Sequence, residues 1–167
     1  MKRTLLSIIC MVVMLAFASV AQGANSIRAT ATASIVSIDN GITAVKGLVF
    51  GNIVPDVVAA GTVTIDTNGR RTKTGNLTLV TSTYRAAEFD VHHNNKHSYT
   101  ITLPSGTVKI WSGSNWMYVG NFTKSVADRT PLVGELGSFT VGATLNVNAN
   151  QATGVYSGTY NVHVDFQ

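Results

Sequence analysis

The sequence predicts an all-β protein, an antiparallel sandwich of the immunoglobulin-like kind. Apolar and polar residues alternate over short stretches, and beyond the N-terminus no stretch keeps the 3.6-residue apolar period of a helix. Gly, Asn and Pro separate these stretches at short intervals, as turns between strands do. The clearest alternation covers 154–167, where one face carries Tyr156, Tyr160, Val162, Val164 and Phe166. We therefore expect one domain of about nine or ten short strands.

The N-terminus reads as a secretory signal peptide over residues 1–21. Lys2 and Arg3 are followed by an apolar run and then by small residues, with Ala21 as the expected cleavage site and Gly23 or Ala24 as alternatives. A membrane anchor is the other interpretation, but the run has only about 14 residues, and a spanning helix needs roughly 20. We expect export, with no transmembrane segment in the mature chain.

The composition excludes several kinds of chemistry. Cys10 is the single cysteine and lies in the expected signal peptide, so disulfides, thiol catalysis and zinc–thiolate or iron–sulfur sites are excluded from the mature chain. The formal charge of +4 falls to +2 when Lys2 and Arg3 are removed, because 12 basic residues become ten against eight acidic ones. So small an excess does not favour nucleic acid as a partner.

The first stretch of the mature chain alternates and then changes phase. Ile27, Ala29, Ala31, Ala33 and Ile35 share one face, whereas Val36 and Ile38 continue one residue out of step. A one-residue slip turns the apolar set to the opposite face, which indicates either a bulge or two segments with different roles. We predict a separate strand-like segment at 22–36, a turn at 39–41 and a sandwich domain over 37–167.

The remaining elements follow in order. The alternation at 61–66 and the turn residues at 67–69 predict a strand entering a hairpin, followed by a solvated basic loop that contains Arg70, Arg71 and Lys73. Later strands are expected around the following apolar positions: Leu77 and Leu79; Phe89 and Val91; Tyr99, Ile101 and Leu103; Val108 and Ile110; Met117 and Val119; Phe139, Val141, Ala143, Leu145 and Val147.

Two groups of residues could carry a binding site. His92, His93 and His97 could hold a metal, but adjacent strand residues point to opposite faces, so we interpret them as a polar hairpin tip. Trp111 and Trp116 flank a polar loop and could stack on a sugar, although such pairs more often pack across a hairpin. No carboxylate pair or nucleophile motif appears. We expect no catalysis, cofactor or metal.

The two ends of the chain resemble the subunits of bacterial chaperone–usher fimbriae (pilins). The likeness is strongest to the disulfide-free branch that forms thin or capsule-like fibres, and to related uncharacterised secreted β-domains. Such subunits have an aromatic residue next to last, alternating apolar residues before it and a glycine fourteen places from the end; here these are Phe166, then Val164, Val162 and Tyr160, and Gly154. Phe50-Gly51 and the Ala-Thr repeat at 29–33 add to the likeness.

The resemblance implies an incomplete sandwich that a donated strand completes. It gives Ile27, Ala29, Ala31, Ala33 and Ile35 the role of a donor face, and Gly154, Tyr156, Tyr160, Val162, Val164 and Phe166 the role of the strand used in chaperone binding and assembly. The implied partners are identical or related subunits, a periplasmic chaperone and an outer-membrane usher. The implied location is the periplasm and then the cell surface. One departure is the small alanine side chains of the donor face. The alternative is a monomeric secreted binding module, which could bind carbohydrate.

Overall fold

The computed structural model describes residues 41–92, 98–131 and 136–167, which belong to one compact unit. These residues form an all-β antiparallel sandwich without α-helices, which confirms the predicted fold class. Within the described residues, no helix is long and apolar enough to cross a bilayer. The strands are β1 (Gly41–Lys46), β2 (Ile53–Val54), β3 (Gly61–Ile65), β4 (Arg71–Thr74), β5 (Thr78–Leu79), β6 (Ala87–His92), β7 (Ser98–Thr102), β8 (Val108–Ser112), β9 (Asn115–Lys124), β10 (Thr130–Pro131), β11 (Leu136–Val147) and β12 (His163–Phe166).

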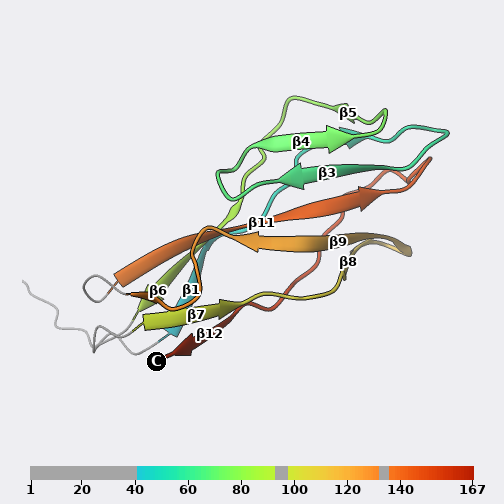
Figure 1. Cartoon of the computed structure of the whole chain (residues 1–167). Helices are drawn as coiled ribbons and strands as arrows, with labels where there is room; N and C mark the ends of the chain where they lie inside the picture. Colours follow the sequence, from blue (N-terminus) through green and yellow to red (C-terminus); the bar gives the residue numbers. More distant parts are fainter. Residues whose placement is uncertain (1–40, 93–97, 132–135) are drawn as a thin grey trace, which may run out of the picture. The chain divides into compact units, whose positions relative to one another are not determined.

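The long strand β11 is the centre of a seven-stranded sheet. On one edge it pairs first with β6 and then with β3, and on its other edge it pairs with β9 (Figure 1). Leu145 shows the arrangement, because it lies opposite Val63 of β3 on one side and opposite Val119 of β9 on the other. The sheet is extended by β1 next to β6, by β4 next to β3 and by β8 next to β9.

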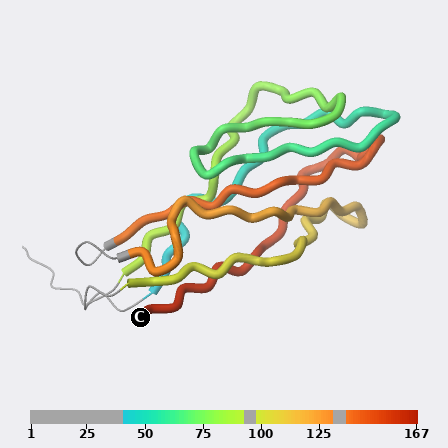
Figure 2. Tube along the Cα trace, in the orientation of Figure 1, coloured from blue at the N-terminus to red at the C-terminus, as the bar shows by residue number. Residues whose placement is uncertain are grey.

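A second layer covers part of this sheet. Strand β7 pairs with β10 and with β12, and in the latter pair Phe166 lies opposite Tyr99. Strands β2 and β5 form a separate short ribbon. The trace in Figure 2 shows the C-terminal segment, in red, leaving the end of β11 and running down to β12.

The apolar interior consists of two clusters of buried side chains, and β11 contributes to both. The first lies between β6, β7 and β11 and contains Ala87, Phe89, Val91, Tyr99, Ile101, Phe139 and Val141. The second lies at the other end of β11 and contains Val63, Leu77, Met117, Val119, Ala143, Leu145 and Val147. The buried residues of β6, β7, β9 and β11 alternate with less buried ones, as the period-two pattern predicts.

The hairpin predicted at 61–69 is confirmed. Strands β3 and β4 pair from Ile65↔Arg71 to Thr62↔Thr74, and the Asp66 carboxylate accepts hydrogen bonds from the N–H groups of Asn68 and Arg70 at 2.9 and 2.8 Å. A short side chain that bonds to the backbone just ahead of it fixes a tight turn.

The basic loop predicted after this turn is wrong, because 71–74 is strand β4. The Arg71 guanidinium donates hydrogen bonds to the carbonyl oxygens of Phe50 and Val80 and stacks at 4.4 Å over the ring of Tyr84. A planar guanidinium can satisfy two carbonyls at once while its face packs on an aromatic ring. Arg71 is therefore a structural clip between β4 and the segments next to β2 and β5, and not a freely solvated charge.

The predicted C-terminal strand is shorter than the alternation suggests. Only His163–Phe166 forms a ladder, with β7, and the stretch before it makes a single bridge, Trp111↔Ser157. The predicted signal peptide and the donor face at 27–35 lie outside the described residues, as do His93 and His97. Of the turn predicted at 39–41 only Gly41 is described, and it begins β1.

Candidate functional site: an apolar groove between two chain segments

A groove of about 730 Å³ lies over the second core cluster, between segments 48–55 and 151–160. Its floor is apolar and comes from three neighbouring strands of the large sheet. It consists of Val108, Ile110, Met117, Val119, Leu145 and Val147. Little of the floor is exposed, since Leu145 is only 2% and Met117 only 7% exposed.

The first wall, 48–55, is hydrogen-bonded to the segment 79–85. Val49 exchanges backbone hydrogen bonds of 3.0 and 2.9 Å with Arg85, and Ile53 lies opposite Leu79 in the short ribbon. Gly51 has a φ of +79°, and a Cβ there would lie 2.4 Å from the Arg71 guanidinium, so glycine is required where Arg71 crosses. The first wall is thus held in place by β5 and Arg71.

The second wall, 151–160, is weakly paired, and in the described part of the chain its backbone bridges to β8 alone. Ser157 and Trp111 exchange two backbone hydrogen bonds of 2.8 and 3.0 Å, which form its single bridge to β8. A Cβ at Gly158 would lie 2.8 Å from the carbonyl oxygen of Lys109, so glycine allows this close approach. Backbone groups alternate in direction along an extended strand, so those of Tyr156 point towards the groove. No described strand pairs with that edge.

Gln151 secures the turn at which the second wall begins. Its side-chain amide donates to the hydroxyl of Tyr156 at 2.8 Å and to the carbonyl of Trp116 at 3.3 Å, and its oxygen accepts from the Asn148 amide. The Tyr156 hydroxyl in turn donates to the carbonyl of Ala152 at 2.6 Å. The wall is therefore anchored at this turn and again at β12, with little attachment between them.

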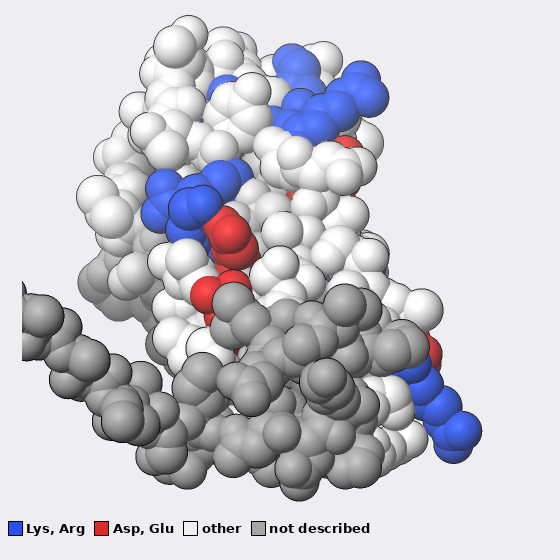
Figure 3. Space-filling view, turned by 90° about the vertical axis from the view of Figure 1, so that its left-hand side faces the viewer, with Lys and Arg blue, Asp and Glu red and all other residues white. Residues whose placement is uncertain are grey.

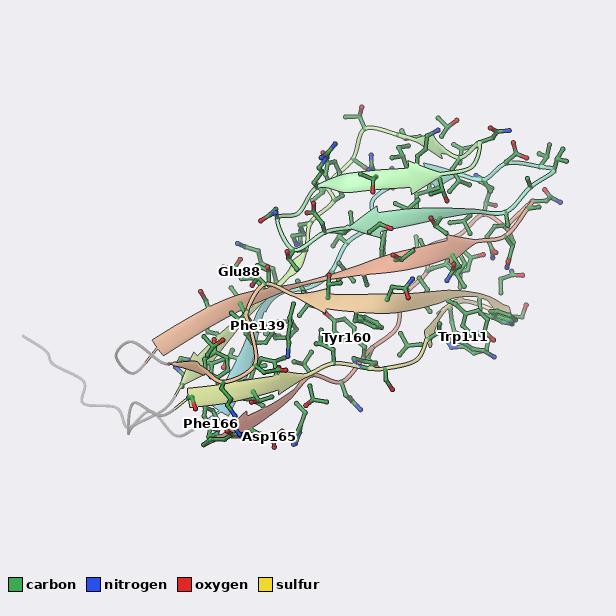
Figure 4. The ribbon with its side chains drawn as sticks, in the orientation of Figure 1. Glu88, Trp111, Phe139, Tyr160, Asp165 and Phe166 are labelled. Atoms are coloured by element: carbon green, nitrogen blue, oxygen red, sulfur yellow. The ribbon has the colours of Figure 1, made fainter. Side chains whose placement is uncertain are left out.

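Tyr160 lies where the groove meets the first core cluster. Its ring packs against Phe122 at 4.9 Å between centroids, and Figure 4 shows it below β9. The Tyr160 hydroxyl is buried and has no hydrogen-bond partner among the described residues. Burial raises the pKa of Tyr160 to about 12, because the phenolate would lose its hydration. An unsatisfied hydroxyl at the end of an open slot is a group that an incoming backbone could satisfy.

The structure divides the predicted assembly strand into two parts. Gly154, Tyr156 and Tyr160 line the groove. Val162, Val164 and Phe166 instead pack on the first cluster. The predicted common apolar face exists, since all five large residues are half-buried and Ser157, Thr159, Asn161, His163 and Asp165 are exposed. Sequence reasoning missed the first wall and the floor, because alternation identifies a strand but not the space beside it.

The tryptophan pair behaves as a hairpin contact. Trp111 and Trp116 lie opposite each other in the β8–β9 ladder. The Lys109 ammonium lies 5.3 and 4.6 Å from the centres of these two rings and 5.7 Å from that of Tyr118, and Trp116 contacts Tyr118 edge-on. These contacts agree with the interpretation that the two tryptophans pack across a hairpin.

Charge and titratable groups add no second site in the described part of the chain. On the face in Figure 3 the basic side chains lie in separate groups, some of them next to acidic ones, and do not form a continuous stripe. Lys46 pairs with Glu88, and Lys124 with Asp128. Among the described residues, no three His, Cys, Asp or Glu side chains converge as metal ligands.

Comparison with known families identifies the family of the domain. Residues 40–166 match the family described as a domain of unknown function, DUF4402. The chain belongs to this family. No curated protein and no solved structure matches the DUF4402 chain. The matched region spans the whole described sandwich, with both walls of the groove, so the groove is part of a DUF4402 domain.

Proposed function

We propose that this DUF4402 protein is a structural subunit of a surface fibre, in which one copy completes the sandwich of the next by donating a strand. One observation carries the proposal. The apolar groove lies between two segments that, among the described residues, are each paired with one other segment and not with each other, so one more strand between them would complete the layer. An added strand would bond to the exposed edge and cover the apolar floor, which is β-augmentation.

The donor is the N-terminal segment 22–36 of a neighbouring copy. Its face of Ile27, Ala29, Ala31, Ala33 and Ile35 spans about 30 Å at roughly 3.3 Å per residue, and the first wall, 48–55, spans about 26 Å on the same scale. Small side chains also suit a slot whose floor is nearly covered. The donor face carries alanines where other donor strands have larger side chains, and these alanines suit the little space above the groove floor.

The weak second wall gives the donor a way in. Between its anchored turn and β12, this wall has one bridge to β8, so opening it breaks two backbone hydrogen bonds. Local opening of this kind costs far less than global unfolding. Before assembly an open edge promotes aggregation, so the proposal includes a periplasmic chaperone that covers the groove, an outer-membrane usher, and export to the cell surface.

Two matched variants test the donor. Ala31→Asp places a charge on the inserted face, where burial without a partner is costly, whereas Thr32→Asp places the same charge on the opposite face. Polymers would be extracted in cold detergent and run on gels without heating. We expect ladders from wild type and Thr32→Asp, and at least a tenfold loss from Ala31→Asp.

A deletion supplies the second arm. Removal of residues 25–34 should leave a folded subunit that forms no ladder, and a synthetic peptide of residues 25–38 should bind it and raise its melting temperature. Peptide at 100 times its dissociation constant stabilises a protein by about 2.7 kcal/mol. Wild-type ladders from the deletion variant, or no stabilisation by the peptide, would show that this segment is not the donor.

A further inference from the structure

An exposed apolar loop lies next to one end of the groove. Val57 and Val58 are 75% and 84% exposed, and Val155, in the second wall, is 88% exposed. Ala59 and Ala60 of the same loop are also exposed. Single apolar residues on a surface are normal, but a group of large exposed ones indicates a contact site.

The loop is held in place although its side chains face solvent. One Asp56 carboxylate oxygen accepts hydrogen bonds from the N–H groups of Val58 and Ala59 at 2.6 and 2.8 Å, and these bonds lower the pKa of Asp56. The Asp56 carbonyl accepts from the N–H of Asn150 at 2.7 Å, which ties the loop to the turn that begins the second wall. An ordered loop with exposed valines is preorganised for a partner.

The direction of the groove identifies the partner. The two walls run antiparallel. At one end Leu48 and Tyr160 both pack on the first core cluster, and at the other Asp56, which follows Pro55, is hydrogen-bonded to Asn150, which precedes Gln151. At the first end the groove stops at the first core cluster, on which Leu48, Phe122 and Tyr160 pack, so an inserted strand meets closed core there. The second end, by Pro55 and Val155, is therefore where a donor strand leaves the groove and continues to its own domain.

A donor that leaves at this end runs antiparallel to the second wall, whose free edge its backbone would join. Antiparallel pairs are the more stable kind. Five residues lie between Ile35 and Gly41, the first residue of β1, which makes six steps along the chain. They reach at most about 20 Å when fully extended. The donating domain thus has to sit directly against the end of the groove where Val57 and Val58 project.

We propose that the loop 54–60, together with Val155, is the surface against which the domain of the donating copy packs in the fibre. The proposal rests on the proposed function, and it adds a contact between folded domains to the strand exchange. This contact would limit bending between consecutive subunits.

One introduced cysteine can report on this contact. Cys10 is the only cysteine of the chain and lies in the predicted signal peptide, so the introduced cysteine can be labelled selectively in the mature protein. Val58→Cys would carry a fluorophore, and quenching by iodide would be measured in two states. In the first, the 25–34 deletion variant is complemented by the 25–38 peptide, so the groove is filled without a neighbouring domain. In the second, the full-length chain is in polymers. We expect at least threefold less quenching in polymers.

Thr72→Cys on the exposed face of β4 is the control and should be quenched equally in both states. The double variant Val57→Ser, Val58→Ser should still give ladders, but its fibres should bend more, with a persistence length at least twofold shorter in electron micrographs. Equal quenching at Val58 in polymers and in the peptide complex would overturn the domain contact while leaving strand exchange intact. Absence of both polymers and peptide binding would overturn the proposed function and the contact with it.

Discussion

The two ends of β11 lie in the same sheet but are covered in different ways. Around Phe139 and Val141 the sheet is covered by β7 and β12, whose residues join the core directly. Around Leu145 and Val147 the cover is two segments with a 730 Å³ groove between them. Phe139 and Leu145 are both 2% exposed, so exposure alone does not distinguish the closed half from the open one.

The C-terminal segment shows where the difference arises. It is laddered to β7 over His163–Phe166, but it touches β8 through one bridge, Trp111↔Ser157. The same alternating sequence is thus a firm strand over one core cluster and a loosely attached wall over the other. We infer that the closed half stabilises the isolated subunit and that the open half is completed in assembly.

The largest expected effect is in the closed half. Phe139 stacks on Phe89 at 5.2 Å between ring centroids, and it lies in the interior in Figure 4. Phe139→Ala should lower the free energy of unfolding by about 3–5 kcal/mol, because it removes a large buried ring and leaves a cavity. Urea denaturation of the purified subunit measures this change. A loss below about 1 kcal/mol would mean that the first cluster is not the main source of stability.

A smaller loss is expected on the groove floor. Leu145→Ala should cost about 2 kcal/mol in the isolated subunit, the low end for a buried leucine, because the loosely attached wall beside it can collapse into the space that the side chain leaves. When the donor peptide is bound, the same change should cost more, since the peptide then packs on Leu145. Denaturation with and without the peptide compares the two. An equal cost in both states would contradict the assignment of Leu145 to the floor of a filled site.

The smallest effect is expected at the junction of the two halves. Tyr160→Phe removes a buried hydroxyl with no described partner and should raise the free energy of unfolding near pH 7 by about 1 kcal/mol. If the donor backbone bonds to this hydroxyl, the gain should shrink in the peptide complex. A loss of stability in the isolated subunit would show that the hydroxyl has a partner.

The same residue gives a pH dependence with a definite sign. The pKa of Tyr160 rises from 10.0 to about 12 on folding, so between these values the unfolded chain has lost the proton and the folded chain has kept it. The unfolded state then binds fewer protons, and the free energy of unfolding falls as the pH rises from 10 to 12. Tyr160→Phe should flatten this decline, and Tyr99, whose pKa burial also raises, contributes to the slope that remains.

The sequence by itself determined the fold class and the faces of the strands. Period-two alternation is a local property, so it correctly placed Phe139, Val141 and Leu145 in the interior. It also correctly predicted that the large apolar and aromatic residues of the C-terminal segment share one face: Tyr156, Tyr160, Val162, Val164 and Phe166. The hairpin turn was equally predictable, because Asp66 bonds to backbone groups only two and four residues ahead of it.

Only the tertiary structure decided which edges are paired and which are left open. The groove depends on where 48–55 and 151–160 lie relative to β8, β9 and β11, and such pairings join residues far apart in the chain. The sequence predicts that Arg71 is solvated, yet in the structure its guanidinium donates hydrogen bonds to the carbonyl oxygens of Phe50 and Val80. Alternation predicts which way a side chain points. It does not state whether another strand lies beside the backbone, because that depends on the competition of distant segments for the same edge.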